Sequence, residues 1–350
     1  MIFVRLATSE DNQQLLELTA ATEMSGKTSL RIDRKPNFFA LLNMRGQSTV
    51  FVAEHENRIV GSLSISLQQV FINKEVVPVY YIGDFKVAKS HRGKGVGKLL
   101  CDELIAHYSS SPADLFFLTV AKGNTRPLPF FSGRAHIPDF QSVGTFHVHQ
   151  FPGRKQGALK AEKEIETVEA NNEVITFLSD HYCKYQLGSV ITREKLAGCS
   201  IYIIRSQSKI CAAMCLIDTA DVKQNVIMNL DWVTRLSIAV MNTVRKLIGF
   251  SRMPGLNEPV RMFYIKYIAV ENNERSILGR LIRHAQQIAY NTSYSFVSMG
   301  VHEKDPLNAC LAEFFKFTFQ STGLVVSVRD SHLLIDEIKK GVPFEDYSLV

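Results

Sequence analysis

Apolar and polar residues alternate over several short stretches of the first half of the chain, and a period of two is typical of half-buried strands. Other stretches repeat their apolar residues at helical spacing, which predicts amphipathic helices. Strands are predicted at residues 3–7, 48–55, 58–66, 77–87, 114–121 and 145–150, and helices at 8–19, 96–107 and 127–131. The first half therefore has the element order β-α-loop-β-β-β-α-β-α-β.

The same order begins again in the second half. A strand is predicted at residues 166–170, a helix at 174–185, a hairpin at 201–206 and 209–216, and a long strand at 262–270. Arg58 aligns with Lys209 (209 − 58 = 151), whereas Val87 aligns with Val270 (270 − 87 = 183). The difference, 183 − 151 = 32 residues, predicts an insertion, which we assign to an amphipathic helix at 232–250 and a following loop. Such a repeat indicates internal duplication.

A chain of 350 residues is long enough for two domains of ordinary size. We predict a first domain at residues 1–150, a linker at 151–164 and a second domain at 165–350, with the inserted helix near 232–260. The linker is assigned to a basic, Gly-containing run that starts at Pro152. The mixture of strands and helices predicts an α+β (mixed α/β) fold.

Composition narrows the class of protein. The chain is 46% apolar and 21% charged, as in ordinary globular proteins. No apolar run approaches the ~20 residues of a membrane span, and the first residues lack the pattern of a signal peptide. Six cysteines without a CxxC pair are typical of reduced thiols in a cytoplasmic protein and give no metal motif. The formal charge of +6 is spread along the chain, so we expect no nucleic-acid or membrane partner.

Residues 85–98, FKVAKSHRGKGVGK, join the longest predicted strand to a helix through a turn rich in glycine and cations. Gly93, Gly95 and Gly97 allow consecutive backbone N–H groups to converge on one point, because no Cβ interferes. The positive end of the helix dipole lies at the same place. The turn is therefore predicted to bind an anion of phosphate size, the alternative being a solvated basic loop. Full charges are added by Lys89, Arg92, Lys94 and Lys98.

Two other phosphate-binding loops do not fit this segment. A P-loop ends in Gly-Lys-Ser/Thr, and a dinucleotide fold has an acidic residue at the end of the next strand; neither is present. The residues match Arg-x-x-Gly-x-Gly (Arg92, Gly95 and Gly97), with Val87 five positions before the arginine. This pattern resembles the acetyl-CoA signature of the GNAT acyltransferases. The resemblance implies two GNAT-like domains, each with a mixed, mostly antiparallel central sheet flanked by helices.

The resemblance also implies how acetyl-CoA would bind. The backbone of Phe85 and Val87 would pair with the pantetheine arm as an added strand, and the amides of residues 91–98 would hold the diphosphate. Asn124, four residues after Val120, would bond the pantetheine or the leaving thiol, with a plain turn residue as the alternative. The residues implied for the cofactor are Phe85, Lys86, Val87, His91, Arg92, Gly93, Lys94, Gly95, Val96, Gly97, Lys98 and Asn124.

Direct transfer from a thioester to an amine requires an oxyanion donor and a base. The backbone N–H of Val87 is the predicted oxyanion donor. Asp84 is the nearest carboxylate in the strand and the predicted base, unless it only bonds a neighbouring strand or loop. Glu54 and His55, at the end of a neighbouring strand, are weaker candidates for the base.

The general acid and the acceptor site are less visible. The family usually has a tyrosine seven residues after the asparagine, and that position is Phe131 here. The thiolate therefore leaves unassisted, or another group donates the proton, with His147 and His149 as alternatives. Arg31 and Arg34 lie after the first helix, where the family varies its acceptor wall. They could hold a carboxylate or phosphate of the acceptor, or simply be solvated charges on a loop.

The second half carries a degenerate copy of the loop. Arg275 stands five residues after Val270, but the three glycine positions are taken by Ser276, Leu278 and Arg280. Side chains at these positions would occupy the space where the diphosphate approaches the backbone. We therefore predict one cofactor site per chain, and we expect the second half to support the first and to wall off the acceptor cleft.

These observations predict an N-acetyltransferase that moves an acetyl group from acetyl-CoA to a primary amine of a small-molecule or amino-acid-like acceptor. One alternative is a CoA-binding regulatory or sensor module without turnover. The other is an acyltransferase of the same fold that uses another acyl donor, including lipid or tRNA-dependent enzymes. We expect a monomer or a homodimer.

Overall fold

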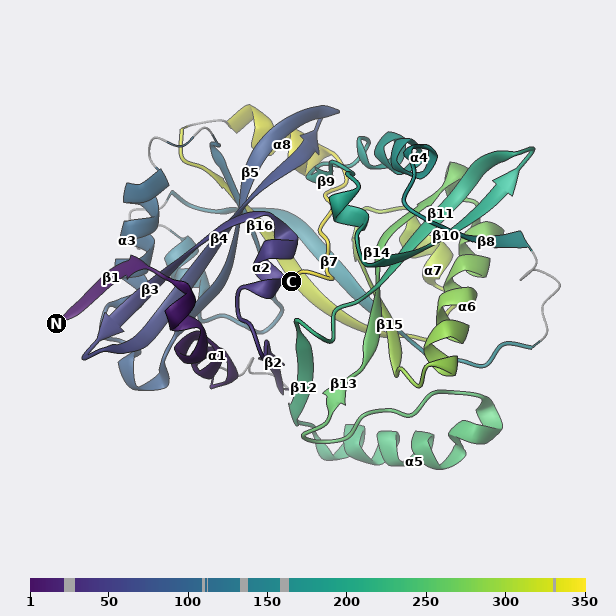
Figure 1. Cartoon of the computed structure of the whole chain (residues 1–350), viewed down its shortest axis with the longest axis horizontal. Helices are drawn as coiled ribbons and strands as arrows, with labels where there is room; N and C mark the ends of the chain where they lie inside the picture. Colours follow the sequence, from purple (N-terminus) through teal and green to yellow (C-terminus); the bar gives the residue numbers. More distant parts are fainter. Residues whose placement is uncertain (22–28, 109–110, 112, 133–137, 158–163, 330–331) are drawn as a thin grey trace.

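The computed structural model describes residues 1–350 apart from residues 22–28, 109–110, 112, 133–137, 158–163 and 330–331. Within the described residues, thirteen strands form one large sheet and three more form a small second sheet. The large sheet runs through the whole molecule, with helices packed against its faces (Figure 1). This confirms the predicted fold class, because all strand pairs are antiparallel except β5 with β6 and β14 with β15.

The first half forms the strands and helices that its apolar pattern predicts, and it adds β2 and α2 in the segment predicted as a loop. Glu56 and Asn57, and then Asn73 and Lys74, have positive φ angles, which is the geometry of tight hairpin turns. These turns fix the register of three long antiparallel strands. The principal elements are β1 (Ile2–Leu6), α1 (Asn12–Ala20), β2 (Ser29–Asp33), α2 (Ala40–Arg45), β3 (Gln47–His55), β4 (Arg58–Ile72), β5 (Glu75–Val87), α3 (Val96–Tyr108), β6 (Leu115–Ala121), the 3-10 helix Leu128–Phe131 and β7 (Gln141–Pro152).

The second half repeats the order of the long strands and helices, and it adds β12, α5 and β13 before β14, and α8 after β16. Gln207 and Ser208 form the hairpin turn that corresponds to Glu56 and Asn57, again with positive φ angles. The principal elements are β8 (Ile165–Val168), α4 (Asn172–Tyr182), β9 (Gly188–Ser189), β10 (Cys199–Ser206), β11 (Lys209–Asp218), β12 (Gln224–Asn229), α5 (Trp232–Ile248), β13 (Pro259–Val260), β14 (Met262–Val270), α6 (Arg275–Asn291), β15 (Phe296–His302), α7 (Leu307–Leu311), β16 (Phe317–Ser327) and α8 (His332–Lys340).

The last strand of each half lies in the other half's part of the sheet. The strand order is β1-β3-β4-β5-β6-β16-β7-β15-β14-β11-β10-β8. β16 therefore pairs with β6 of the first half, and β7 pairs with β15 of the second half. β7 and β16 pair with each other at the centre. The two halves share one continuous sheet, and the segment predicted as a linker begins inside β7; its residues 158–163 lie outside the described residues.

One long helix packs on the sheet in each half. α3 buries Val96, Leu100 and Leu104 against strands of the first half. α6 buries Leu278 and Leu281, among others, against strands of the second half. Each such side chain contributes about 2 kcal/mol by leaving water. The two helices hold equivalent places in the fold, as internal duplication predicts.

A small sheet joins the two halves along one side of the molecule. β2 pairs with β12, and β12 pairs with β13. Arg31 was expected in a loop but lies in β2, opposite Val226. The partner strand comes from the second half of the chain, so the local pattern of the first half does not reveal it.

Candidate active site

The loop at residues 91–98 has the geometry of an anion cradle. It connects β5 to α3, and Gly93 and Gly95 have φ angles of 76° and 81°, a region that residues with a Cβ rarely adopt. A Cβ at either glycine would meet nothing within 4 Å. The first N–H groups of α3 have no partner within the helix. The loop therefore leaves open space for a phosphate-sized anion beside the positive end of α3.

Gly97 serves a different purpose from the other two glycines. A Cβ at this position would lie 2.6 Å from Cζ of Phe130 and 3.2 Å from Cζ of Phe85. The rings of Phe85 and Phe130 are in T-shaped contact, with centroids 5.2 Å apart. Phe131, at the position of the family's usual tyrosine, is buried with its centroid 5.9 Å from that of Phe85. Gly97 thus allows α3 to pack closely on an aromatic wall that offers no phenol.

β5 and β6 separate beyond Tyr81 and Phe117, the last residues that pair. β4 covers the other edge of β5, where the N–H of Ala88 donates to the carbonyl of Val60 at 2.8 Å. Bonded and non-bonded pairs alternate along an antiparallel ladder, so the backbone groups of Val87 face away from β4 and into the gap. Val87 therefore has the orientation required of an oxyanion donor.

The gap opens into a cavity of about 1560 Å³ between the two halves. Its walls come from β5 and β6, from the loop, and from β12, α5, β14 and β16 of the second half. The second half thus closes the cleft, as predicted. Lys94 and Lys98 are not in the wall, and Lys98 is paired with Asp102 at 2.6 Å. The predicted cofactor residues that line the cavity are Phe85, Lys86, Val87, His91, Arg92, Gly93, Gly95, Val96, Gly97 and Asn124.

The segment of the second half that corresponds to the loop is helical. α6 begins at Arg275, which aligns with Arg92, so it starts four residues earlier than α3 does (96 + 183 = 279; 279 − 275 = 4). Leu278 is completely buried in the core, and Arg280 is bonded to Glu164. The side chains at the former glycine positions are therefore part of the packing and of surface ion pairs, and the open turn is missing.

Asp84 lies in the cavity wall, but its carboxylate is bonded to two cations. It has a φ angle of 50° at the point where the register of β4 and β5 shifts. Nη1 of Arg34 donates to one oxygen at 2.7 Å, and Nζ of Lys86 donates to the other at 2.6 Å. The hydroxyl of Ser64 also donates to this carboxylate, at 3.2 Å. The side chains of Asp84 and Arg34 are buried.

These contacts contradict the role of general base predicted for Asp84. Burial alone would raise the pKa of Asp84, but the charges of Arg34 and Lys86 and their hydrogen bonds outweigh burial and hold that pKa well below its usual range. A carboxylate of such low basicity is a poor acceptor for an ammonium proton near neutral pH. Asp84 is instead a structural anion that fixes Arg34 and Lys86 in the cavity wall.

Comparison with known families agrees with this geometry. The family model described as "Acetyltransferase (GNAT) family" matches residues 13–134, which include β3 to β6, the loop and α3. Residues 13–134 form a GNAT domain. This match supports an acyltransferase. No curated protein sequence matches the chain significantly.

Solved structures of the same fold cover nearly the whole chain. A structure of Saccharomyces cerevisiae N-myristoyltransferase with bound myristoyl-CoA superimposes with a TM-score of 0.61 and 12% identity, over 93% of this chain and 82% of that one. A GCN5-related N-acetyltransferase from Anabaena variabilis gives 0.52 and 14%, over 94% and 73%. A probable N-acyltransferase of unknown function from Enterococcus faecalis gives 0.52 and 12%, over 94% and 73%. At these identities the likeness shows the fold alone.

The other residues predicted as bases do not reach the cavity of the GNAT domain. Glu54 accepts a hydrogen bond from Arg5 at 2.8 Å. Nδ1 of His55 lies 3.2 Å from Nε2 of His91, at the start of the loop. Neither Glu54 nor His55 lines the cavity. Both belong to surface contacts that hold β1 and the loop against β3.

The two histidines suggested as acids lie on the wrong face of β7. Side chains alternate along a strand, and Val148 and Gln150 are the ones that line the cavity. His147 and His149 are therefore directed to the opposite face, where both contact Oδ1 of Asn308, at 3.5 and 3.4 Å. Burial lowers the pKa of His149 to about 4. Neither histidine is placed to protonate a thiolate in the cavity.

The structure separates the two arginines predicted to bind the acceptor. Arg34 lines the cavity, whereas Arg31 is in β2 and does not. The buried Nε of Arg34 has no hydrogen-bond partner among the described residues, and neither has the buried hydroxyl of Ser298 on the opposite wall. Oγ1 of Thr19 and Nη2 of Arg45, whose residues also line the cavity, are unsatisfied in the same way, so four such polar atoms lie around it.

Sequence analysis did not identify Lys223, which lies in the second-half wall of the cavity. Its Nζ donates to the main-chain oxygen of Val350 at 2.6 Å and lies 4.7 Å from the ring centroid of Tyr264. Burial lowers the pKa of Lys223 to about 7. It precedes β12 with no motif around it, so only the packing of the two halves reveals its position.

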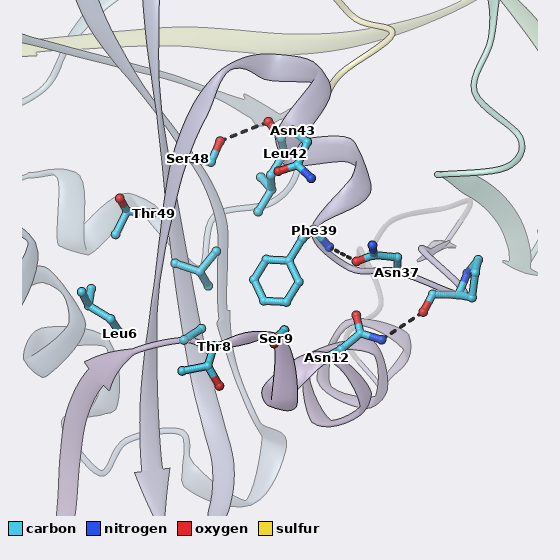
Figure 2. Close-up of a pocket in the computed structure, with 13 residues that line it drawn as sticks. Leu6, Thr8, Ser9, Asn12, Asn37, Phe39, Leu42, Asn43, Ser48 and Thr49 are labelled. Carbon is cyan, nitrogen blue, oxygen red and sulfur yellow. Dashed lines mark hydrogen bonds between the residues drawn. The ribbon is translucent and has the colours of Figure 1, made fainter.

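A second hollow, of about 790 Å³, lies between β1, β3, α1 and α2 (Figure 2). Asn12 donates to the carbonyl of Pro36 at 3.0 Å, and Ser48 donates to the carbonyl of Leu42 at 3.1 Å. Its lining contains no acidic, basic, histidine or cysteine side chain. We therefore assign the chemistry to the larger cavity.

Proposed function

We propose that this protein transfers an acyl group from a CoA thioester to an amine, with the donor bound by the first half only. The observation that carries the proposal is the continuity of three features: the open loop at residues 91–98, the exposed backbone edge at Val87, and the cavity into which both open. Diphosphate, pantetheine and thioester follow one another in the same order along acyl-CoA. The GNAT family match supports this assignment.

Each part of the site would have a distinct task. The amides of the loop and the guanidinium of Arg92 would hold the diphosphate. The N–H of Val87 would stabilise the negative charge that develops on the thioester oxygen. Attack by a neutral amine forms the C–N bond and breaks the C–S bond, and the thiolate takes up the proton that the amine nitrogen releases. Asp84 would act indirectly, by holding Arg34 and Lys86 in place.

The size of the cavity bears on the substrates. Acetyl is the acyl group that the loop pattern implies, and a primary amine is the proposed acceptor. A cavity of about 1560 Å³ exceeds the usual ligand pocket of roughly 300–1,000 Å³, as expected of a space that would hold both a CoA donor and an acceptor. Nε of Arg34 and the hydroxyl of Ser298 would bind the polar group of the acceptor. The yeast N-myristoyltransferase structure contains myristoyl-CoA, so a long acyl chain is the alternative occupant.

Release of free thiol from acyl-CoA donors of increasing chain length, measured against a panel of amines, tests the proposal. We expect release that depends on both donor and amine. Phe131 and the ion-paired Asp84 leave the two positions predicted for the acid and the base without a suitable group, which is the observation that favours a CoA sensor as second candidate. Tight CoA binding with no thiol release from any donor would establish the sensor, and absence of CoA binding would refute both functions.

A further inference from the structure

Helix α5 has an apolar face that is exposed to solvent. It lies along the lower edge of the molecule in Figure 1, and none of its residues is fully buried. Trp232 and Leu247 are 75% and 88% exposed, and Val233, Leu236 and Val240 are more than half exposed. Their spacing of three, four and seven residues puts them on one side of the helix. A stripe of five large apolar side chains facing water is unusual for a surface helix.

The opposite face holds α5 firmly on the body of the protein. Ile238 and Met241 pack against a cluster that contains Met253. Nδ2 of Asn242 donates to the carbonyl of Met253 at 3.0 Å, and the N–H of Met253 donates back to Oδ1 of Asn242 at 2.8 Å. Asp231 caps the first turn by accepting from the N–H of Thr234. The exposed stripe is therefore the outer face of an anchored helix.

The charged side chains of α5 itself are all positive, whereas Asp231 caps its first turn beside Trp232. Arg235, Arg245 and Lys246 lie on α5, and no Asp or Glu occurs between Asp231 and Glu258. A helix with a continuous apolar face, a tryptophan and flanking cations is typical of segments that lie in the interface of an anionic membrane. A second copy of this chain would bring like charges together across the contact, which disfavours a symmetric dimer through this face.

The apolar surface continues from α5 to the mouth of the cavity. The ring of Phe250, just after α5, contacts Phe315 with centroids 6.0 Å apart, and Phe315 contacts Phe317 at 5.5 Å. Phe315, Phe317 and Phe319 are exposed. Phe317 and Phe319 also line the cavity, as does Ile238 on the inner face of α5. The same exposed surface thus borders the opening of the cavity.

We propose that the outer face of α5 and the adjoining phenylalanines bind the surface of a bilayer that contains anionic lipids. The juxtaposition that carries this inference is an anchored, exposed apolar stripe on a helix whose own charged side chains are all positive, next to the mouth of the cavity. It differs from the sequence-based expectation of no membrane partner, because the fold brings apolar side chains from α5 and β16 to one surface. No helix in the described part of the chain has the length and apolarity needed to cross a bilayer, so the contact is confined to the interface.

Trp232 is the only tryptophan of the chain, so its fluorescence reports on α5 directly. The full chain is titrated with vesicles of phosphatidylcholine alone and with vesicles that also contain phosphatidylglycerol, and flotation measures the bound fraction. We expect a blue shift of the emission and binding with the anionic vesicles, both weakened by salt. Exchange of Arg235 and Lys246, the two exposed cations of α5, for glutamine is expected to weaken binding roughly thirtyfold.

Leu236→Glu tests the apolar stripe, and Leu333→Glu is the matched control. Both leucines are exposed on helices, but Leu333 is on α8, at the opposite edge of the molecule in Figure 1. We expect Leu236→Glu to weaken vesicle binding more than about tenfold and Leu333→Glu to leave it unchanged. Equal binding to neutral vesicles, or binding that survives Leu236→Glu, would overturn the proposal. So would a blue-shifted dimer without lipid that Leu236→Glu dissociates, because a second copy would then cover the stripe.

Discussion

The two halves of this protein build the same strand-loop-helix unit and differ at its turn. In the first half the chain leaves β5, forms an open turn with Gly93 and Gly95 at positive φ, and only then enters α3. In the second half α6 starts at the aligned arginine, and Leu278 at the position of Gly95 is buried in the core. The packing of the helix on the sheet therefore does not require the glycines, whereas the anion cradle does.

This difference distinguishes the side chains that stabilise the unit from the glycines that shape the open turn. The apolar side chains of α3 and of α6 pack in the same way, each in the core of its own half. Gly93 and Gly95 contribute nothing to those cores, since a Cβ at either position would meet open space. A substitution in one half should therefore affect binding, while a substitution at the aligned position of the other half should affect stability.

The largest effect is expected from Asp84→Asn. Asp84 aligns with Tyr267 (84 + 183 = 267), and its removal leaves the buried Arg34 and Lys86 without their counter-charge. We expect the free energy of unfolding to fall by about 3–5 kcal/mol at neutral pH. Asp102→Asn, which breaks the solvent-exposed pair with Lys98, should cost about 0.5 kcal/mol or less in the same urea titration.

The loss from Asp84→Asn should depend on pH with a defined sign. The pKa of Asp84 is lower in the folded chain than in the unfolded chain, so its carboxylate stabilises the fold above the unfolded value, about 4, and loses this contribution as the pH falls toward the folded value. The difference between variant and parent should therefore be full at pH 7 and shrink in acid. A difference that grows below pH 4 would mean that the ion pair is assigned wrongly.

Leu278→Ala should destabilise the second half without changing CoA binding. The side chain is completely buried, so its truncation removes apolar contacts and leaves a cavity. We expect a loss of about 3 kcal/mol in the free energy of unfolding, measured by denaturant titration. An increase in the dissociation constant for CoA, measured where the variant is fully folded, would show that the second half takes part in donor binding.

Gly95→Leu should have the opposite effect, because it copies the second half's own residue into the open turn. The φ angle of 81° strains any residue with a Cβ, and the leucine side chain would occupy the space of the anion. We expect the dissociation constant for CoA to rise about 100-fold in calorimetry, from the loss of charge-assisted hydrogen bonds. Gly198→Leu is the control: Gly198 has a φ angle of 74° and open space around it, but lies in the second half. Equal losses in both variants would point to unfolding.

The sequence predicted the loop, the hairpins, the long helices and the inserted helix, because each is determined by local features. Glycine spacing, turn residues at Glu56 and Asn57, and helical apolar periodicity all act within a few residues. Asp84, in contrast, was wrongly predicted to be a base. Its role depends on Arg34, which is fifty residues away in the chain. No local pattern reveals that Arg34 and Lys86 converge on its carboxylate.

The exchange of β7 and β16 was not predictable either. An alternating strand such as residues 145–150 satisfies its pattern equally well beside β6 or beside β15. The choice depends on the pairing of the whole sheet, which also decides that Val148 and Gln150 line the cavity and His147 and His149 do not. The cavity wall contributed by the second half, including Lys223, follows from the same long-range packing.

The smallest effect on binding is expected from the charges around the loop. Arg92 lines the cavity, and Arg92→Ala should weaken CoA binding about tenfold, with a shallower dependence on salt than the parent shows. Arg275→Ala, at the aligned position of the second half, removes an arginine that is paired with Glu313 and should leave binding unchanged. An equal effect of the two changes would indicate general electrostatic attraction in place of a specific site.

The central claim is that this chain has one donor site, built by the first half alone. Titration calorimetry with CoA measures the number of sites directly, on the parent chain and on Gly95→Leu. We predict one CoA per chain, with the heat of binding lost in Gly95→Leu and kept in Gly198→Leu. Two CoA molecules per chain, or one that remains bound in Gly95→Leu, would contradict the account.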